Sequence, residues 1–395
     1  MHDIYFIGVI FIISLLVASL AHRPVLLFAK KHNFYDNPNA RKLQRRPIPV
    51  MGGFVVFVGA MVGSLCYWFK YDCLSIVPIQ LAMLMMLIIG AWDDVRKISP
   101  GLRLVLEILI VTALALGNNY PINDLHSLWG RNGISPWVAW PLTIIGCVGI
   151  INAINMIDGI DGLSSGICIM AFGFYSWMFF KGHDFVRAAL GVSIVGALIP
   201  FFVMNVFGKR SKMFIGDAGT MMLGIALCDM VMAMLTKDSV CAKKYDGTDF
   251  CLIAFAYAVL SVPVCDTLRV ILGRISRGES PFHPDKTHLH HAFIDYGFHH
   301  LETSLLEIML NMLIILCFAI FAKSYLSMQW QLYGTVVASI AVCFGLYWLL
   351  GRRKRLAQKL SEQYGISLEE YENLTDEEKK QLKSKLDNKK TINTL

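Results

Sequence analysis

The stretch Asn152-Ala-Ile-Asn-Met-Ile-Asp-Gly-Ile-Asp-Gly-Leu-Ser-Ser-Gly166 separates two apolar runs of membrane-spanning length. Its carboxamides, Asn152 and Asn155, are three residues apart, and so are its carboxylates, Asp158 and Asp161. On a helical turn, each pair would share one face. Oxygen ligands beside glycines suit a hard cation such as Mg²⁺ and the phosphates that it carries. An ordinary polar turn is the alternative, but such a turn requires none of these four side chains.

The composition places the chain among membrane proteins. Of its 395 residues, 55% are hydrophobic and 16% are charged, whereas a soluble domain has about 25% charged residues. The net charge of +7 reflects basic loops beside a membrane rather than a surface for nucleic acid. We therefore expect an all-α, polytopic protein of about eleven spans of roughly 20 residues each. The predicted spans are 4–22, 52–69, 76–92, 103–117, 136–154, 165–180, 186–206, 218–236, 250–271, 304–322 and 331–350.

Basic residues divide unevenly between the two sets of loops. The loop at 23–51 and the run at 352–355 lie on the same predicted side and are rich in Lys and Arg. By the positive-inside rule this side is cytoplasmic, so the N-terminus is predicted outside and the C-terminus inside. We expect a transmembrane catalytic domain at 1–350 and a charged cytoplasmic tail at 351–395. In that tail, Thr375-Asp-Glu-Glu378 reads as a capping box that opens a short amphipathic helix.

Two further acidic motifs stand at predicted helix ends. Asp93 and Asp94 follow the third span directly, where they either form a plain polar helix end or have a function. Asp217 stands between Gly216 and Gly219 at the start of a helix. Glycines there would let an anionic ligand reach free backbone N–H groups, and Asp217 would repel that ligand unless a cation lay between them. The alternative is that Asp217 is a simple N-cap.

Histidines are concentrated in one predicted loop. His288, His290 and His291 fall within four residues, after Lys286. They could form a zinc site, but cysteines are absent nearby and the other candidate ligands are oxygens. Donors that spread over several oxygens suit a diphosphate better. In the predicted topology all four motifs lie on the cytoplasmic side, which favours one shared site.

Five pieces of the sequence together resemble the polyprenyl-phosphate N-acetylhexosamine-1-phosphate transferase family. They are Arg45-Arg-Pro-Ile-Pro-Val-Met-Gly-Gly53, Asp93-Asp94, Asn152-Ala-Ile-Asn-Met-Ile-Asp-Gly-Ile-Asp161, Phe214-Ile-Gly-Asp217 and His283-Pro-Asp-Lys-Thr-His-Leu-His-His291. The resemblance covers all eleven predicted spans and excludes the tail. The last piece is similar to the bacterial branch that makes N-acetylglucosaminyl-diphospho-undecaprenol, and the human-type branch lacks it. The resemblance therefore implies an enzyme of the bacterial inner membrane.

The family resemblance implies a reaction and a set of roles. A UDP-N-acetylhexosamine, here UDP-GlcNAc, and undecaprenyl phosphate would give a lipid-linked sugar diphosphate and UMP, with Mg²⁺ or Mn²⁺ as cofactor. The roles that the resemblance implies are Asn155 and Asp217 as metal ligands, Asp93 and Asp94 facing the lipid phosphate and the metal, Asp158 and Asp161 at the nucleotide end, and the three histidines on the diphosphate. Asn152 belongs to the same motif, and Lys97 and Arg103 would offset the approach of two anions.

Several alternatives remain open from the sequence. Another UDP-N-acetylhexosamine or UDP-MurNAc-pentapeptide would undergo the same chemistry, and a homodimer is an open alternative to a monomer. Asp93 could act as a general base, or it could orient a lipid phosphate that is already deprotonated at neutral pH, since the second pKa of a phosphate monoester is about 6. Direct attack and a covalent aspartyl-phosphate route both fit. A secondary transporter of an anionic substrate is the alternative from another class, although transporters bind their substrates near the bilayer midplane.

Overall fold

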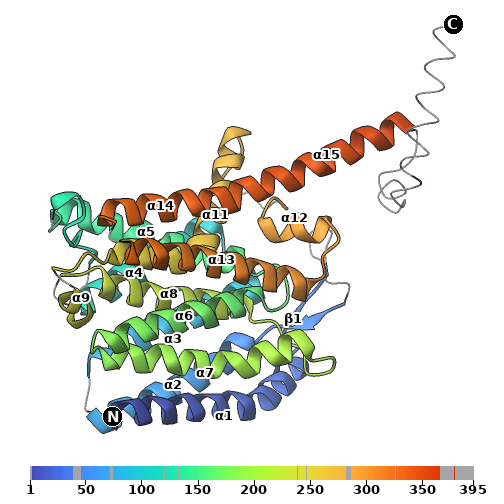
Figure 1. Cartoon of the computed structure of the whole chain (residues 1–395). Coiled ribbons are helices and arrows are strands. Elements are labelled where there is room, and N and C mark those ends of the chain that lie inside the picture. The colour runs from blue at the N-terminus through green and yellow to red at the C-terminus, as the bar shows by residue number, and fades with distance from the viewer. Residues whose placement is uncertain are drawn as a thin grey trace, which may run out of the picture.

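The computed structural model is a bundle of long helices that lie side by side (Figure 1). It describes residues 2–38, 46–71, 74–118, 121–131, 133–237, 239–245, 247–281, 286–324, 326–364 and 378. The α-helices are α1 (His2–Lys31), α2 (Gly52–Tyr71), α3 (Val77–Arg96), α4 (Pro100–Asn118), α5 (Pro136–Met156), α6 (Leu163–Lys181), α7 (Phe185–Phe207), α8 (Gly216–Met234), α9 (Val240–Tyr245), α10 (Leu252–Val259), α11 (Ser261–Ser276), α12 (Leu289–Asp295), α13 (His300–Lys323), α14 (Met328–Ile340) and α15 (Leu346–Tyr364). Short helical turns η1 (Leu74–Ile76), η2 (Leu128–Gly130) and η3 (Ala341–Gly345) and two strands, β1 (Tyr35–Asp36) and β2 (Ile48–Pro49), complete the described elements.

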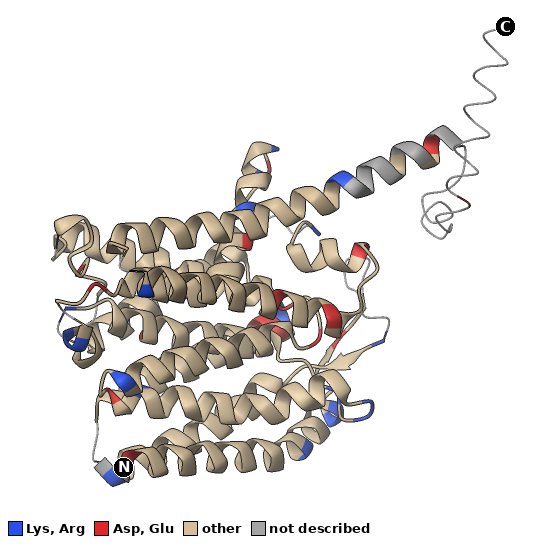
Figure 2. Cartoon of the chain, viewed as in Figure 1, with Lys and Arg blue, Asp and Glu red and all other residues tan. Residues whose placement is uncertain are grey.

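The prediction of an all-α polytopic protein is confirmed. Within the described residues, ten helices are long and apolar enough to cross a membrane, and one bent pair brings the number of spans to as many as 11. Figure 2 shows that charged residues lie mostly toward the ends of the bundle and are sparse along most helix lengths. The predicted placement of the termini on opposite sides of the membrane stays a prediction.

The ninth predicted span is not one helix. The segment predicted at 250–271 consists of α10 and α11, which meet at an angle of 74°. Pro263 has no N–H to donate to the Val259 carbonyl one turn earlier, and its ring crowds that carbonyl. The Asn311 side-chain amide of α13 donates to the Ala258 and Val259 carbonyls, at 3.1 Å each, and its oxygen accepts from the Val262 N–H at 3.0 Å. The backbone is therefore satisfied at the break, as a membrane interior demands.

Helix α8 lies at the centre of the bundle and is almost entirely buried. Glycines bring its first turn against two neighbouring helices. A Cβ atom on Gly90 of α3 would lie 2.4 Å from the Asp217 carbonyl oxygen, and one on Gly53 of α2 would lie 2.5 Å from the Gly219 nitrogen. Small residues allow such close backbone approach between membrane helices. The start of α8 is thereby fixed against the ends of α2 and α3.

The N-terminal loop reaches the same place through a small sheet. Strands β1 and β2 pair antiparallel, with Asp36 opposite Ile48. The segment after β2 then bonds to the chain before α8, because Gly52 N donates to the Phe214 carbonyl at 2.8 Å and Phe214 N donates to the Pro49 carbonyl at 2.9 Å. Arg45 and His283 to Asp285 of the quoted motifs lie outside the described residues.

The last span continues beyond the membrane-length segment predicted at 331–350. A π turn, η3, joins α14 to α15 with helical backbone angles at both joints, and α15 then runs on to Tyr364. In Figure 1, α15 extends past the end of the bundle toward the C-terminus. The predicted capping box at 375–378 lies outside the described residues, apart from Glu378.

Candidate active site

A cavity of about 600 Å³ lies where the ends of several helices meet. Seven of the residues singled out from the sequence line it: Asp94, Lys97, Asn155, Asp158, Asp161, Asp217 and His291. The other four, Asp93, Asn152, His288 and His290, lie outside its lining. The cavity joins loops that are far apart in the chain, as the hypothesis of a single shared site requires.

Asp217 and Asn155 contact each other directly. The Asn155 side-chain amide, at the end of α5, donates to Asp217 Oδ1 at 2.7 Å and to Thr220 Oγ1 at 2.8 Å. Lys97 Nζ lies 3.8 Å from the other carboxylate oxygen, Oδ2. The Asp217 side chain retains 26% of its exposure and Lys97 retains 73%. Asp217 therefore presents its carboxylate to the cavity, where Asn155 is a close partner and the exposed Lys97 is a more distant one.

Asp94 caps the first turn of α8 from a different helix. Its Oδ1 accepts from Asp217 N at 3.0 Å and its Oδ2 accepts from Ala218 N at 3.1 Å. The expectation that an anionic ligand would find free N–H groups at this helix start is therefore wrong for these two amides, because Asp94 already occupies them. A carboxylate at a helix N-terminus is electrostatically favourable. Asp94 thus fixes the backbone that carries Asp217.

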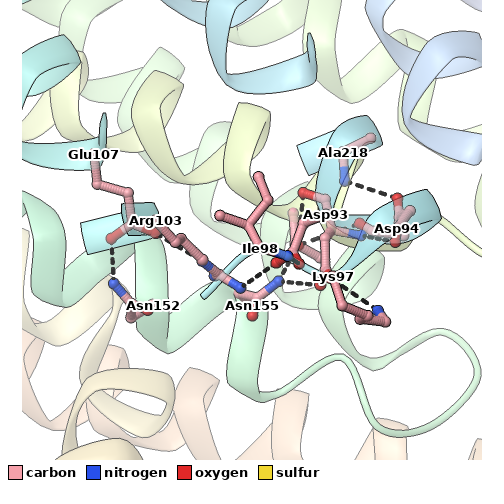
Figure 3. A network of polar contacts seen from close by, with 12 residues as sticks. Asp93, Asp94, Lys97, Ile98, Arg103, Glu107, Asn152, Asn155 and Ala218 are labelled. Atoms are coloured by element: carbon pink, nitrogen blue, oxygen red, sulfur yellow. Dashed lines mark hydrogen bonds and ion pairs between the residues drawn. The ribbon is translucent and has the colours of Figure 1, made fainter. Parts of the chain in front are cut away.

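The side chain of Asp93 has other partners than that of Asp94, and Figure 3 shows both within one network of polar contacts. Asp93 Oδ1 accepts from Ile98 N at 2.8 Å, and its Oδ2 is 3.4 Å from Arg103 Nη1. Arg103 Nε donates in turn to Glu107 Oε1 at 2.9 Å, one turn further along α4. Asn152 donates to Glu107 Oε2 at 2.6 Å. This buried chain ties the end of α3 to α4 and α5 behind the cavity wall.

Asp161 lies among basic partners at another part of the cavity. Lys212 Nζ is 2.5 Å and His300 Nδ1 is 3.2 Å from its Oδ2. Burial alone would raise the pKa of Asp161, but the hydrogen bonds and positive charge of His300 and Lys212 outweigh it and lower the pKa below its usual value. Ser304 also donates to the Asp161 carbonyl at 2.8 Å. The loop before α6 is thereby fastened to α13 and to the loop before α8.

Asp158 has the opposite environment. Its carboxylate is buried, and Ser164 Oγ donates to its Oδ1 at 2.5 Å. Burial raises the pKa of Asp158 to about 7, against the lowering effect of that hydrogen bond. Two carboxylates three residues apart therefore differ in proton affinity, because only Asp161 has cationic partners.

The three histidines have different places. His291 lines the cavity, whereas His288 and His290 are buried beside it. Burial, with the neighbouring His291 and His288, lowers the pKa of His290 well below its usual value. The His290 ring lies against the backbone of Gly159, where an added Cβ would be 2.3 Å from Nε2. A glycine is required at this close approach.

Among the described residues of the cavity lining, carboxylates outnumber Lys and Arg. The acidic residues are Asp36, Asp94, Asp158, Asp161 and Asp217, and the basic ones are Arg46, Lys97 and Lys212. Phosphate groups would be repelled by such a lining unless a cation were bound with them. In the described parts of the chain, no three carboxylate, imidazole or thiolate groups lie close enough to hold a metal ion alone. Mg²⁺ usually binds through one or two carboxylates, waters and substrate phosphates, so the donors present fit it.

The sequence assigned no individual role to several lining residues, although Arg46 and Ser164 stand in the quoted motifs: Asp36, Arg46, Ser164, Asn205, Lys212 and His300. Asp36 and Arg46 reach the cavity through the pairing of β1 with β2, a contact that no periodicity indicates. In the sequence, Asn205 is distinguished only by its position near the end of the span predicted at 186–206. Its Oδ1 accepts from Gly162 N at 2.9 Å, so it supports the loop that carries Asp161.

Comparisons with known proteins identify the family of this chain. The profile described as Glycosyl transferase family 4 matches residues 76–235, which include α3, α5 and the start of α8. A protein of Pasteurella multocida named undecaprenyl-phosphate alpha-N-acetylglucosaminyl 1-phosphate transferase is 31% identical over 297 residues, covering 72% of this chain and 79% of the relative. A Haemophilus influenzae protein of the same name is 30% identical, covering 66% and 72%. A Bacillus subtilis protein, named as a probable undecaprenyl-phosphate N-acetylglucosaminyl 1-phosphate transferase, is 27% identical, covering 80% and 85%. The chain belongs to glycosyl transferase family 4.

Proposed function

We propose that this chain transfers N-acetylglucosamine 1-phosphate from UDP-GlcNAc to undecaprenyl phosphate, which gives GlcNAc-diphospho-undecaprenol and UMP. The names of its relatives supply the reaction type and the lipid. The product would be the first membrane-bound intermediate of a cell-surface polysaccharide.

The contact between Asn155 and Asp217 inside the cavity carries this proposal. Residues 62 positions apart meet at 2.7 Å where two membrane helices, α5 and α8, end and begin. A soluble nucleotide sugar and a lipid phosphate can both reach a site at helix ends, whereas a site at mid-membrane would exclude the first. This placement favours a transferase over a transporter.

Mg²⁺, or Mn²⁺, is the proposed cofactor, with Asp217 and Asn155 as its protein ligands. The amide nitrogen of Asn155 now bonds to the carboxylate, and the same amide offers an oxygen at its other end for a cation. When bound, the ion would supply charge neutralisation for the diphosphate and the departing UMP. Lys97 Nζ, 3.8 Å from Asp217, would contact the same phosphates.

The nucleophile in our proposal is the lipid phosphate, attacking the β-phosphorus directly. With a second pKa of about 6, a phosphate monoester is largely deprotonated at neutral pH. Asp93 is held by Ile98 and Arg103 outside the cavity lining, so its proposed part is to position α3 rather than to accept a proton. Catalysis then consists of positioning and electrostatic stabilisation, as is general for phosphoryl transfer.

Asp158 and Asp161 are proposed to face the nucleotide and His291 the diphosphate. The cavity would open toward the cytoplasm of a bacterial inner membrane, because the basic loops lie at that end of the predicted topology. A homodimer stays a prediction from the sequence.

Purified protein in lipid nanodiscs tests the function. We expect UMP release from UDP-GlcNAc only when undecaprenyl phosphate and Mg²⁺ are both present, with a lipid-linked GlcNAc diphosphate detected by mass spectrometry. UDP-GalNAc and UDP-MurNAc-pentapeptide serve as competing donors. Absence of UMP with every donor would contradict the proposal, and faster reaction with another donor would change the sugar. Single-turnover reactions with labelled donor test the direct route, because a labelled protein intermediate would contradict it.

A further inference from the structure

A buried carboxylate, Asp266 of α11, organises the histidine segment although it lies outside the cavity lining. Its Oδ2 is 2.8 Å from His288 Nδ1, so the His288 N–H donates to it. Its two oxygens also accept from Leu289 N, the first residue of α12, at 3.2 and 3.3 Å. Asp266 therefore caps α12 from a different helix and fixes the orientation of the His288 ring.

Arg269, one turn further along α11, holds both Asp266 and the chain before α12. Its Nε and Nη2 lie 3.1 and 2.6 Å from Asp266 Oδ1, and Nη2 also donates to the Thr287 carbonyl at 2.5 Å. The face of its guanidinium stacks on the ring of Tyr347, with 3.7 Å between the guanidinium carbon and the ring centroid. Tyr347 is the second residue of α15, directly after the π turn η3.

The contacts continue from His288 into the cavity. The rings of His288 and His290 are stacked, with centroids 5.5 Å apart and an interplanar angle of 12°, and the His291 ring follows at 4.4 Å from that of His290. His290 lies against Gly159, next to Asp158, and His291 lines the cavity. An unbroken row of contacts thus joins the start of α15 to the cavity wall.

Helix α15 contacts α12 as well, and in Figure 1 it passes close to α12 as it leaves the bundle. An arginine that donates two N–H groups to one carboxylate oxygen and also stacks on a ring is geometrically demanding, since Lys can reproduce neither the pair of donors nor the stacking. A cation–π contact that is shielded from water is also stronger than an exposed one. The geometry around Arg269 is therefore more exacting than a buried ion pair alone would require.

We propose that Asp266, Arg269 and Tyr347 are positioning residues for the transfer reaction, and that α15 holds the histidine segment in its substrate-binding position through the Tyr347–Arg269 stack. This inference rests on the proposed function in one respect, namely that His291 contacts the diphosphate of the substrate. The position of α15 would then set the affinity of the site for the nucleotide sugar.

Hydrogen exchange of the full-length protein in nanodiscs tests the coupling without any substrate. We expect Tyr347→Leu to speed amide exchange in residues 287–295 by about 3- to 30-fold, the range that loss of a cation–π contact allows, while exchange in α8 stays unchanged. Tyr347→Phe, which keeps the ring, should behave as wild type. Trp348→Leu is the matched control, because Trp348 is the neighbouring aromatic residue and its side chain is 53% exposed. Unchanged exchange in 287–295 for Tyr347→Leu, or an equal increase for Trp348→Leu, would overturn the proposal.

Arg269→Lys is the second variant, and it tests the proposal independently if Tyr347→Leu does not fold. It keeps the charge and should loosen the same segment. In an active preparation, both variants should raise the KM for UDP-GlcNAc more than they lower kcat, with Tyr347→Phe restoring the wild-type KM. A fall in thermal stability with an unchanged KM would assign these residues a merely structural role. If the wild-type protein were inactive while the variants still showed the expected differences in amide exchange, the proposed function would be contradicted. The coupling between α15 and the histidine segment would still be supported.

Discussion

Helix α8 carries an aspartate near each end, and the two ends differ in how completely those charges are paired. Asp229 is 1% exposed, and both of its oxygens are matched: Arg187 Nε lies 3.2 Å from one and Asn118 Nδ2 lies 2.8 Å from the other. Arg187 also bonds to Asp184 at 3.0 Å. Asp217, at the other end, opens onto a cavity and has one close side-chain partner.

The difference shows what separates a structural polar cluster from a candidate active site. Both ends contain aspartate, asparagine and a cation, so residue type alone does not distinguish them. At the Asp229 end the donors and acceptors satisfy one another. At the Asp217 end, the cavity leaves space for a ligand, and the Asp217 carboxylate is incompletely paired.

Asp217→Asn should have the largest effect on turnover. Removing the charge at the proposed metal site should lower kcat by about 10³-fold, the scale of losing a major electrostatic contribution to a transition state. Thermal stability should remain close to wild type, because the carboxylate is incompletely paired. UMP release and thermal unfolding in nanodiscs measure the two effects. Activity above a tenth of wild type would remove Asp217 from the site.

Arg187→Met should show the converse behaviour at the other end of α8. Removing the arginine leaves Asp184 and Asp229 buried without their cation, which typically costs about 3–5 kcal/mol. We expect a clear fall in the thermal unfolding temperature, with kcat per folded molecule little changed. A large loss of kcat in well-folded protein would mean that this end also takes part in the reaction.

Gly159→Ala should impair the site by displacement rather than by loss of charge. The new Cβ would lie 2.3 Å from His290 Nε2, so either the loop or the ring must shift. Small misplacements of positioned groups can cost up to about 10²-fold in rate, and we expect a loss of about 10- to 100-fold in kcat/KM. Gly146→Ala on α5 is the control, because a Cβ there meets nothing within 4 Å. Equal activity of the two variants would contradict the close packing of His290.

Asp158→Asn should have the smallest effect, which is a change in thermal stability that depends on pH. Because burial raises the pKa of Asp158 from 3.8 to about 7, the folded state holds its proton more tightly than the unfolded state does. Wild-type stability from this group is therefore full below about pH 4, falls as the pH rises, and is lost above about pH 7. Asn cannot ionise, so the variant should gain a few degrees in unfolding temperature relative to wild type above pH 7, and nothing near pH 4.

Thermal scans in EDTA from pH 4 to pH 8 measure this difference. A constant difference across the range would show that the pKa of Asp158 is not raised. Asp161→Asn is the comparison, since the pKa of Asp161 is lowered and its substitution should destabilise the protein above pH 4.

Much of the fold and about a third of the cavity lining could be predicted from the sequence. Long apolar runs specify spans because a membrane requires them, and loops with Asp, Asn and Gly at span ends indicated Asp94, Asn155, Asp158, Asp161 and Asp217. Proximity of those residues followed from the predicted topology. It required no knowledge of side-chain packing.

Two kinds of feature could not be predicted: the direction in which a side chain points, and the contacts between segments that are distant in the chain. Asp93 and Asp94 are adjacent, and successive helical residues point about 100° apart, so only one of them could face the cavity. The sequence gives no reason to choose Asp94. Lys212 and His300 reach Asp161 through loops whose paths depend on tertiary contacts. The break in the ninth span had a local signal in Pro263, but its stable form depends on Asn311 from another helix.

The break between α10 and α11 gives the protein an asymmetric outline. The end of α11 projects from the bundle in Figure 1, and Leu268, Leu272 and Ile275 are exposed along it. These exposed apolar side chains suit contact with the acyl chains of the surrounding lipids. Because α11 also carries Asp266 and Arg269, one helix joins this exposed apolar surface to the histidine segment.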